Sequence, residues 1–234
     1  MKYELYYWPE IQGRGEFVRL ALEEAGADYV DVARSGRGMS AMMKLMEKGG
    51  TPPFAPPFLK AGKLVIGQTA NILFYLGPRH GLAPKSESGG LWVHQLQLTI
   101  TDLVAEIHDT HHPLGPSLYY EDQRPPAKRR TAEFWTERAR KYLGYFEQLL
   151  ADSGGNYVTG RRLTYVDLSL FQIVDGLRYA FPRRMRRFEN EVPGLIGLHD
   201  SIAARPNIKA YLDSDRRIPF NEQGIFRHYR ELDG

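Results

Sequence analysis

The chain contains no cysteine. Disulfide bonds, thiolate-ligated metal sites and enzymes whose own nucleophile is a thiol are therefore excluded. The sequence also lacks any apolar run of the roughly 20 residues that a membrane-spanning helix needs. Its first residues, MKYELYYWPE, have no apolar segment typical of a secretory signal. We therefore expect a soluble protein of the cytoplasm that does not enter a membrane.

The sequence also has no large excess of positive or negative charge, since its formal net charge is +3. The most basic stretches are RPPAKRR at 124–130 and FPRRMRRF at 181–188. A nucleic-acid-binding patch is one interpretation of these stretches. Since 28 acidic residues balance the charge, helix ends and solvated faces are the better interpretation. We expect no nucleic-acid partner.

Hydrophobic residues make up 42% of the 234 residues, enough for one large domain or two modest ones. Up to residue 80, strand and helix patterns alternate. Strands are predicted at 3–8, 28–32 and in a hairpin at 58–66 that turns at Ala61 and Gly62, and helices at 16–26, 40–50 and 69–77. A strand-helix-strand unit followed by a helix, a hairpin and a helix predicts a mixed sheet with helices on both faces.

The composition changes after a polar, Gly/Ser-rich linker at 80–90, and the rest of the chain is predicted to be helical. Long amphipathic patterns cover 91–109 and 130–152. Another helix begins at Thr164, where Asp167 completes a capping box. We therefore expect an α/β domain at 1–80, an all-α domain at 88–218 and a C-terminal tail at 219–234.

The stretch FAPPFLKAGKLVIGQTANI carries the first candidate site. Pro57 precedes a strand, which is a position where a cis bond can expose the preceding carbonyl. Gln68 and Thr69 follow at the start of a helix, whose free N–H groups and positive dipole end suit a carboxylate. Together these features look like a socket for a small extended peptide with a free carboxylate. A plain hairpin followed by a capped helix is the alternative, and spacing alone favours it.

The order of elements, the proline that opens the third strand, the Gln-Thr pair and the Thr-x-x-Asp box together resemble a cytosolic glutathione transferase of the tyrosine-using, bacterial and sigma–pi-like type. The resemblance extends from Lys2 to about Ser214. It implies an N-terminal thioredoxin-like domain and an all-helical C-terminal domain. It also implies an enzyme that activates the glutathione thiolate for attack on a small hydrophobic electrophile. A non-catalytic glutathione-binding or scaffold protein and a glutathione-dependent isomerase are the alternatives.

The resemblance implies a set of glutathione-binding residues. Pro57 would follow the cis bond, and Gln68 and Thr69 would bind the γ-glutamyl carboxylate. The residue before the cis proline usually contacts the cysteinyl backbone of glutathione through both its N–H and its carbonyl. Here that residue is Pro56, which has no N–H, so only the carbonyl contact remains.

Two further residues are assigned to glutathione on weaker grounds. Lys48 is a candidate ligand for the glycyl carboxylate, although its loop does not match the family's usual pattern. Asp102 lies on the first long helix, where several relatives use an aspartate that reaches the glutathione amino group across a two-fold dimer. A homodimer is therefore implied, and a solvent-facing helical aspartate is the alternative for Asp102.

Either of two adjacent tyrosines at the end of the first strand could be catalytic. In the family, this tyrosine is followed by an aromatic residue, often a proline, and then a Gly-Arg pair, which here favours Tyr7 over Tyr6. A hydroxyl that donates to the glutathione sulfur favours the thiolate. Lowering the thiol pKa by one to two units is worth about 1.4 to 2.7 kcal/mol. Arg14 could add positive charge near the sulfur, or it could be an ordinary solvated arginine.

Histidines gather in the stretch EIHDTHHP, where His108 and His112 are four residues apart, like two metal ligands on a helix face. The general-base glutamate of the zincin motif is missing, and Pro113 ends the helix at once. We therefore expect no metal there, and histidines that line a pocket or the domain interface. The proposed electrophile pocket consists of Trp8, Ile11, His108 and Tyr119, for each of which ordinary packing is the alternative.

Overall fold

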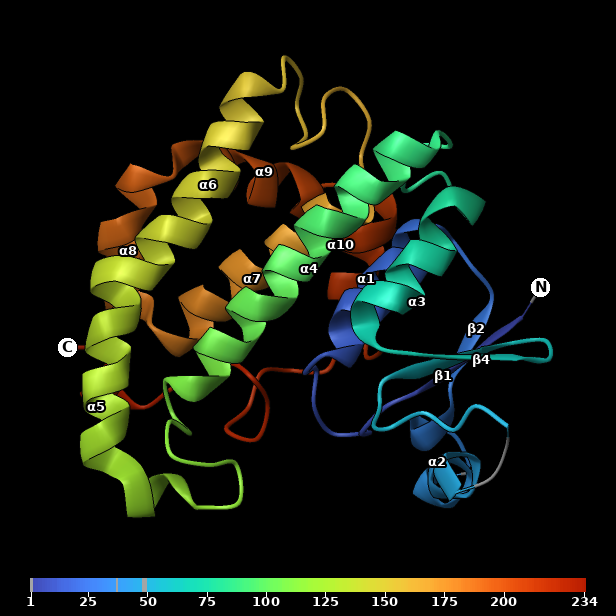
Figure 1. The fold of residues 1–234 in the computed structure, drawn as a ribbon, viewed down its shortest axis with the longest axis horizontal. Coiled ribbons are helices and arrows are strands. Elements are labelled where there is room, and N and C mark those ends of the chain that lie inside the picture. The colour runs from blue at the N-terminus through green and yellow to red at the C-terminus, as the bar shows by residue number, and fades with distance from the viewer. Residues whose placement is uncertain (1, 37, 48–49) are drawn as a thin grey trace.

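The computed structural model describes residues 2–36, 38–47 and 50–234, and Figure 1 shows a small sheet beside a larger group of helices. The sheet consists of β1 (Tyr3–Tyr6), β2 (Tyr29–Asp31), β3 (Phe58–Ala61) and β4 (Leu64–Gly67), in the order β2-β1-β3-β4. Strand β2 runs parallel to β1, whereas β3 is antiparallel to both β1 and β4. The predicted mixed sheet is therefore confirmed.

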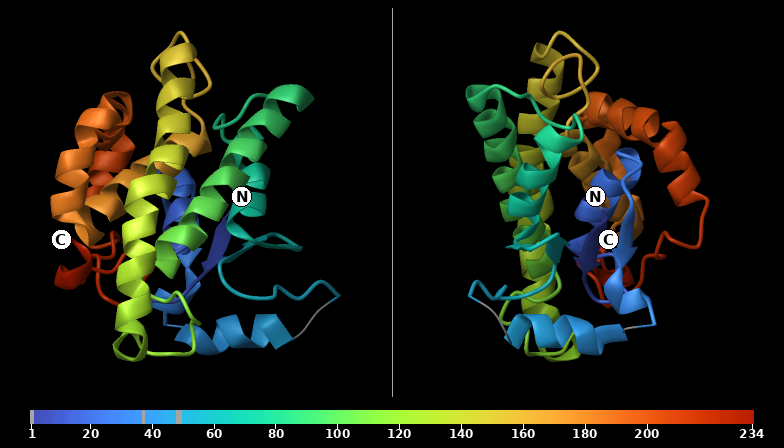
Figure 2. Two further views of the ribbon diagram at one scale, coloured as in Figure 1. Left: turned by 60° about the vertical axis from the view of Figure 1, so that its left-hand side comes forward. Right: turned by 90° about the vertical axis from the view of Figure 1, so that its right-hand side faces the viewer.

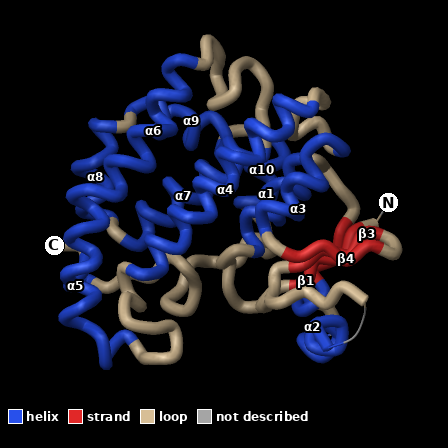
Figure 3. Tube along the Cα trace, in the orientation of Figure 1, coloured by secondary structure: helices blue, strands red, loops and turns tan. Residues whose placement is uncertain are grey.

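Helices cover both faces of this sheet, as predicted. Helices α1 (Gly15–Glu24) and α3 (Thr69–Leu76) pack on the face that carries Leu5. Helix α2 (Gly38–Glu47) packs on the opposite face, where Met42 lies with Tyr6 and Phe58. Figure 3 shows α2 on the far side of the strands from α1 and α3. Because side chains alternate along a strand, β1 contributes to both layers.

The β-hairpin differs from the prediction by one residue. The turn lies at Gly62 and Lys63, and not at Ala61 and Gly62, because Ala61 still pairs with Leu64 within the ladder. Gly62 adopts a φ of +62°. A left-handed conformation is available to glycine without the steric penalty that other residues pay there. The backbone geometry of the turn thus places the glycine first.

The remaining helices form the second part of the chain, where only helical elements are found among the described residues. They are α4 (Glu87–Asp109), α5 (Arg124–Glu133), α6 (Ala139–Asp152), α7 (Tyr165–Ala180), α8 (Pro182–Phe188), α9 (Pro193–Ala203) and α10 (Pro206–Leu212). A π-helical turn at Phe134–Arg138 joins α5 to α6, and Figure 2 shows these two as one long rod alongside α4. Helix α7 is buried along nearly its whole length.

Two helix starts were predicted too late. Helix α4 begins at Glu87, inside the predicted linker, because the Ser86 side chain accepts a hydrogen bond from the Gly89 N–H at 3.3 Å. Helix α5 begins at Arg124 because its prolines occupy the first turn, where a missing N–H costs nothing. The basic stretch 181–188 also contains a helix of its own, α8, which was not predicted.

The capping box at the start of α7 is confirmed. The Asp167 carboxylate accepts from the Thr164 N–H at 2.7 Å and from the Thr164 hydroxyl at 2.8 Å. It also accepts from the Val158 N–H at 2.9 Å, which ties the preceding loop to the helix. Burial raises the pKa of Asp167 to about 6, and these three donors oppose that rise.

The C-terminal tail is docked onto the helices. Phe226 is buried against Gly176 of α7, where an added Cβ would lie 2.4 Å from the phenyl ring. The Asp233 carboxylate accepts from the Arg183 and Arg184 N–H groups at the start of α8, both at 3.0 Å. No helix of the described residues is long and apolar enough to cross a membrane.

Candidate active site

Tyr7 directly follows β1 and lies beneath the loop that leads into α1. Its hydroxyl accepts a hydrogen bond from the Arg14 N–H at 2.9 Å, and its ring is buried. Burial raises the pKa of Tyr7, while the N–H groups of Arg14 and Gly15 lower it. The hydroxyl therefore stays protonated at neutral pH. Because it acts as acceptor toward Arg14, its own proton remains available to a further acceptor.

Tyr6 points to the opposite layer. Its ring stacks on Phe58 with a centroid separation of 4.7 Å, in the cluster that α2 covers. Its hydroxyl donates to the Glu4 carboxylate at 2.6 Å. A hydroxyl already committed to a carboxylate on the α2 side is poorly placed to serve a group beside α1. This geometry favours Tyr7 as the thiol-activating residue.

The Gln68-Thr69 pair opens α3, as the sequence predicted. Gln68 has a φ of +67°, the one positive φ at a non-glycine position among the described residues. A long side chain pays a steric cost there, and such strain often marks a ligand-binding position. The N-cap of α3 is Gln68. Thr69 is the first helical residue, so its hydroxyl is free to bond elsewhere.

A single residue links this pair to the tyrosine. The Thr69 hydroxyl donates to the Arg14 carbonyl at 3.3 Å, while the Arg14 N–H donates to Tyr7. The backbone of Arg14 thus lies between the Tyr7 hydroxyl and the free N–H groups that begin α3. Arg14, Gln68 and Thr69 also line one cavity of about 250 Å³, together with residues of α4 that include Val104.

The peptide bond between Pro56 and Pro57 is cis, as predicted. Pro57 is buried and precedes β3, while Pro56 is partly exposed. Neither residue has a backbone N–H, so the Pro56 carbonyl is the backbone group left for a ligand. The cis bond before β3 and the Gln68-Thr69 pair at the start of α3 therefore lie in the elements predicted for them.

Sequence comparisons agree with this architecture. A family described as "Glutathione S-transferase, C-terminal domain" matches residues 108–215. A glutathione S-transferase of Plasmodium falciparum is 26% identical over 216 residues, which are 89% of this chain and 93% of that protein. Glutathione S-transferase P 1 of Xenopus laevis is 27% identical over 224 residues, which are 92% of this chain and 93% of that protein.

Solved structures show the same fold. A Pi-class glutathione S-transferase of Onchocerca volvulus superposes with a TM-score of 0.71 at 22% identity, covering 91% of this chain and 93% of that chain. Prostaglandin synthase D of Nilaparvata lugens gives a TM-score of 0.73 at 20% identity, covering 94% of this chain and all of that chain (100%). The chain has the glutathione transferase fold, and its residues 108–215 match the C-terminal domain of that family. Its sheet and the helices α1 to α3 are the thioredoxin-like part of that fold, and α4 to α10 the helical part.

Within this glutathione transferase fold, the weaker assignments occupy the surface or lie beyond the described residues. Asp102 is exposed on α4. Lys48 lies outside the described residues. The assignment of these two residues to glutathione therefore stays a prediction.

The four residues predicted to line the electrophile pocket are divided in space. Trp8 and Ile11 line a cavity of about 380 Å³ together with Met39 and Gln223. His108 and Tyr119 are not among the residues that line it. Tyr119 is 78% exposed just before a short 3-10 helix, so its place in a pocket is not supported by this arrangement. His108 lies at the end of α4 among other histidines.

A buried ionic network lies next to the site and was not predicted from the sequence. The Arg19 side chain on α1 is fully buried, although an arginine on an amphipathic helix is expected to face solvent. Its guanidinium donates to Glu16 at 3.1 Å and to Asp31 at 2.8 Å. These carboxylates compensate for the cost of burying the charge. A helical Glu-x-x-Arg pair is usually exposed, so the sequence offers no signal for this burial.

The same network joins the two parts of the chain. Glu16 also accepts hydrogen bonds from Tyr211 at 2.7 Å and from Arg217. Arg217 in turn donates to Asp175 on α7 at 2.8 Å. The start of α1, which positions Tyr7 through the preceding loop, is therefore held by residues from the far end of the chain.

Proposed function

We propose that the chain is a tyrosine-type glutathione transferase that acts in the cytoplasm as a homodimer. The observation that carries the proposal is the position of Arg14. Its backbone binds the Tyr7 hydroxyl on one side and the Thr69 hydroxyl on the other. A glutathione whose γ-glutamyl carboxylate binds at the start of α3 would extend its sulfur along this backbone toward Tyr7.

The chemistry follows from the protonation state of Tyr7. Because burial raises its pKa, the phenol acts as a hydrogen-bond donor and not as a base. Donation to the sulfur favours the thiolate over the thiol, and the thiol proton passes to solvent. The thiolate then attacks an electrophilic carbon, so that a sulfur–carbon bond forms while the leaving group departs with its bonding electrons.

Glutathione binding is assigned to the residues around the cis bond and α3. Gln68 and Thr69 would bind the γ-glutamyl carboxylate with side-chain and N–H donors at a helix N-terminus. The Pro56 carbonyl would accept from the cysteinyl N–H of glutathione. The second backbone contact usual in the family is impossible at a proline, so we expect weaker glutathione binding than with a residue that has an N–H.

The homodimer is supported by exposed apolar side chains on α3, on α4 and before β3. Phe54 is 94% exposed, which is unfavourable for a phenyl ring unless a partner covers it. Leu91, Trp92 and Leu98 on α4 are exposed as well. A two-fold dimer over this face would bury these side chains and bring Asp102 toward the partner's site. Sedimentation of the wild type and of Phe54→Ala tests this part of the proposal, and a monomeric wild type would contradict it.

The deciding experiment compares Tyr7→Phe with the matched control Tyr6→Phe. Both lose one hydroxyl, but only the first loses the group beside Arg14. We expect glutathione conjugation to a generic aromatic electrophile to fall about 10- to 100-fold in Tyr7→Phe, corresponding to a rise of one to two units in the thiol pKa. Tyr6→Phe should retain the rate.

The alternatives give different results in the same experiment. If the wild type is retained on immobilised glutathione but conjugates no electrophile, the chain is a binding or scaffold protein. Isomerisation of a substrate without net consumption of glutathione would indicate an isomerase. Loss of rate in Tyr6→Phe alone would transfer the catalytic role to Tyr6.

A further inference from the structure

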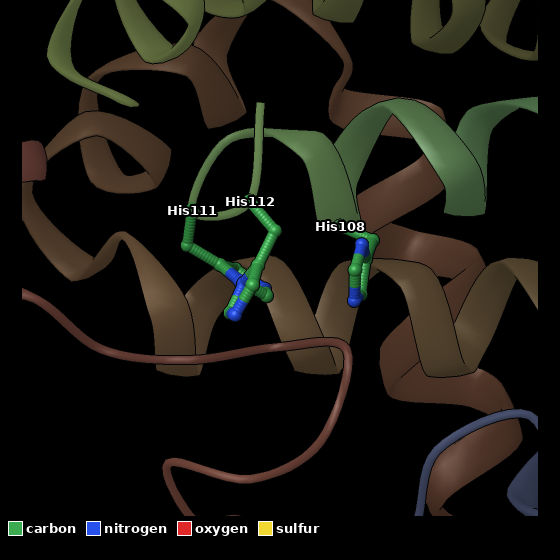
Figure 4. Close-up of side chains that lie close together, drawn as sticks. All are labelled: His108, His111 and His112. Atoms are coloured by element: carbon green, nitrogen blue, oxygen red, sulfur yellow. The ribbon is translucent and has the colours of Figure 1, made fainter. Parts of the chain in front are cut away.

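Three histidines lie together where α4 ends. His108 is in the last turn of the helix, and His111 and His112 follow in the turn after it. Their potential ligand nitrogens all lie within 4.8 Å of one another. Figure 4 shows the rings of His111 and His112 converging, with the ring of His108 beside them. The spacing of the sequence had indicated only the pair His108 and His112.

Hydrogen bonds fix the orientation of the central ring. The Nε2 of His111 lies 2.8 Å from the Ile225 carbonyl oxygen, so it carries the proton. The Nδ1 of His111 therefore holds a lone pair, and it lies 2.5 Å from Nδ1 of His112. A histidine that donates one N–H to a backbone carbonyl and offers its other nitrogen is the usual arrangement of a metal ligand.

The imidazoles of this cluster are neutral at physiological pH. Burial is the main cause, and it lowers the pKa of His108 to about 4 and that of His111 to about 2. The pKa of His112 is lowered by burial and by Arg227. Neutral imidazole is the form that binds metal ions, so protons do not compete for the site.

The charges around the cluster have both signs. Arg14 and Arg227 lower the pKa of His108, whereas Glu121 raises that of His112. The Asp109 carboxylate lies 3.8 Å from Nδ1 of His108. Arg227 donates to the carbonyl oxygens of Gly224 and Gln223. These two hydrogen bonds hold the Arg227 guanidinium against the backbone of the C-terminal tail.

We propose that His108, His111 and His112 form a three-imidazole binding site for a divalent transition metal, with Zn²⁺ as the best match. Tetrahedral Zn²⁺ with bonds of about 2.0–2.1 Å places its ligand nitrogens about 3.4 Å apart. The closest nitrogens, on His111 and His112, must therefore separate by about 1 Å, while the most distant must approach. Side-chain rotation is sufficient for both movements.

A metal ion would also connect rings that the protein itself hardly connects. Among the hydrogen bonds of the described residues, only one joins two of the three rings. The His108 side chain is 24% exposed, so an ion can reach the cluster from solvent. Because His111 is bonded to Ile225, the ion would connect the end of α4 to the C-terminal tail.

The test is a calorimetric titration of the full, untagged chain with Zn²⁺, repeated with Co²⁺ as an optical probe. We expect one ion per chain in the wild type. His108→Gln and the double variant His111→Gln/His112→Gln should each weaken binding at least about tenfold. The matched control is His80→Gln, since His80 pairs with the Tyr3 hydroxyl at 2.9 Å, outside the cluster. Its binding should equal that of the wild type.

Thermal unfolding gives a second readout. Zn²⁺ should raise the Tm of the wild type and of His80→Gln, because an ion that binds only the folded state stabilises it. At the same Zn²⁺ concentration the Tm of His108→Gln should rise by clearly less than that of the wild type, because its binding is weaker. If the double variant does not fold, His108→Gln decides, since this side chain is partly exposed. Absence of Zn²⁺ and Co²⁺ binding by the wild type, or equal binding by His108→Gln, would overturn the proposal whatever the result of the glutathione experiments.

Discussion

Gly13 is the residue whose replacement tests the site most sharply. It has a φ of +44°, and a Cβ built on it would lie 2.1 Å from the Tyr7 hydroxyl oxygen and 2.9 Å from two ring carbons. Contacts this short cannot persist, so either the Tyr7 ring or the loop before α1 must move. The substitution Gly13→Ala therefore disturbs the proposed catalytic hydroxyl without changing that residue.

The expected magnitude combines two costs. A left-handed conformation costs an alanine roughly 1–2 kcal/mol, which lowers the free energy of unfolding. Displacement of Tyr7 costs the thiolate stabilisation, about 1.4 to 2.7 kcal/mol for one to two pKa units. The second cost appears in catalysis. We therefore expect kcat/KM for conjugation, measured below the thiol pKa, to fall about 10- to 100-fold.

Gly81→Ala is the matched control. Gly81 also has a positive φ, +71°, but a Cβ there would meet no atom within 4 Å. The control therefore pays the conformational cost and makes no contact with Tyr7. We expect Gly81→Ala to lower the Tm while kcat/KM stays near that of the wild type. Equal rates for Gly13→Ala and the wild type would show that Tyr7 does not activate the thiol as proposed.

A double-mutant cycle with Tyr7→Phe separates the two explanations for a loss of rate. If Gly13→Ala acts by displacing the Tyr7 hydroxyl, it should cost little more rate once the hydroxyl has been removed. Steady-state rates of the two single variants and the double variant give the coupling directly. Additive losses would mean that Gly13→Ala impairs some other feature of the site, and the link to Tyr7 would be refuted.

Three further predictions concern stability. Thr164→Ala should lower the free energy of unfolding by about 1–2 kcal/mol, because it breaks a buried capping box. Ser86→Ala, at an exposed cap, should lower it by about 0.5–1 kcal/mol. Denaturant titrations measure both values. Arg19→Met should cost about 3–5 kcal/mol, because Asp31 loses its ion-pair partner and Glu16 keeps only Arg217. Arg216→Met, at a surface pair, should cost less than about 1 kcal/mol, and similar losses for the two variants would refute this role for Arg19. The folded-state pKa of His108 is about 4, below the unfolded value of about 6.5. The contribution of His108 to the free energy of unfolding is therefore complete above pH 6.5 and is lost as the pH falls toward 4. This loss, about 3 kcal/mol, should be missing in His108→Gln.

Much of the fold could be predicted because local patterns determine it. The Thr-x-x-Asp box predicted the start of α7, since a capping box depends on residues three positions apart. The strand and helix order up to α3 followed from hydrophobic spacing and glycine positions in the same way. Helix starts were less well predicted: the amphipathic pattern begins at 130, whereas α5 begins at Arg124 with its prolines in the first turn.

The choice between Tyr6 and Tyr7 illustrates a limit of strand periodicity. Alternation predicts that the two side chains face opposite layers, and it cannot say which layer holds the ligand when helices cover both faces. The structure adds the hydroxyl partners, a carboxylate for Tyr6 and the Arg14 N–H for Tyr7. These partners depend on the path of the loop before α1, which no short motif specifies.

The burial of Arg19 was unpredictable because its environment comes from distant segments. Glu16 lies three residues before it, but Glu16 is itself held by Arg217, which is 201 positions further along the chain. Amphipathic analysis considers one helix at a time and assigns arginine to solvent. Only the packing of α1 against the end of the chain turns this Glu-Arg pair into a buried one.

This network also bears on the proposed catalysis. The Arg19 guanidinium carbon lies 5.7 Å from the centroid of the Tyr7 ring, and its charge lowers the pKa of Tyr7, against the effect of burial. A phenol in an apolar site without such charges would be a weaker hydrogen-bond donor to a thiolate. In the proposed mechanism Arg19 would polarise this donor, and Glu16 and Asp31 hold its guanidinium beside the Tyr7 ring. The same ion pairs thus stabilise the contact between the two parts of the chain and hold a positive charge that, with Arg14, opposes the burial-induced rise in the pKa of Tyr7.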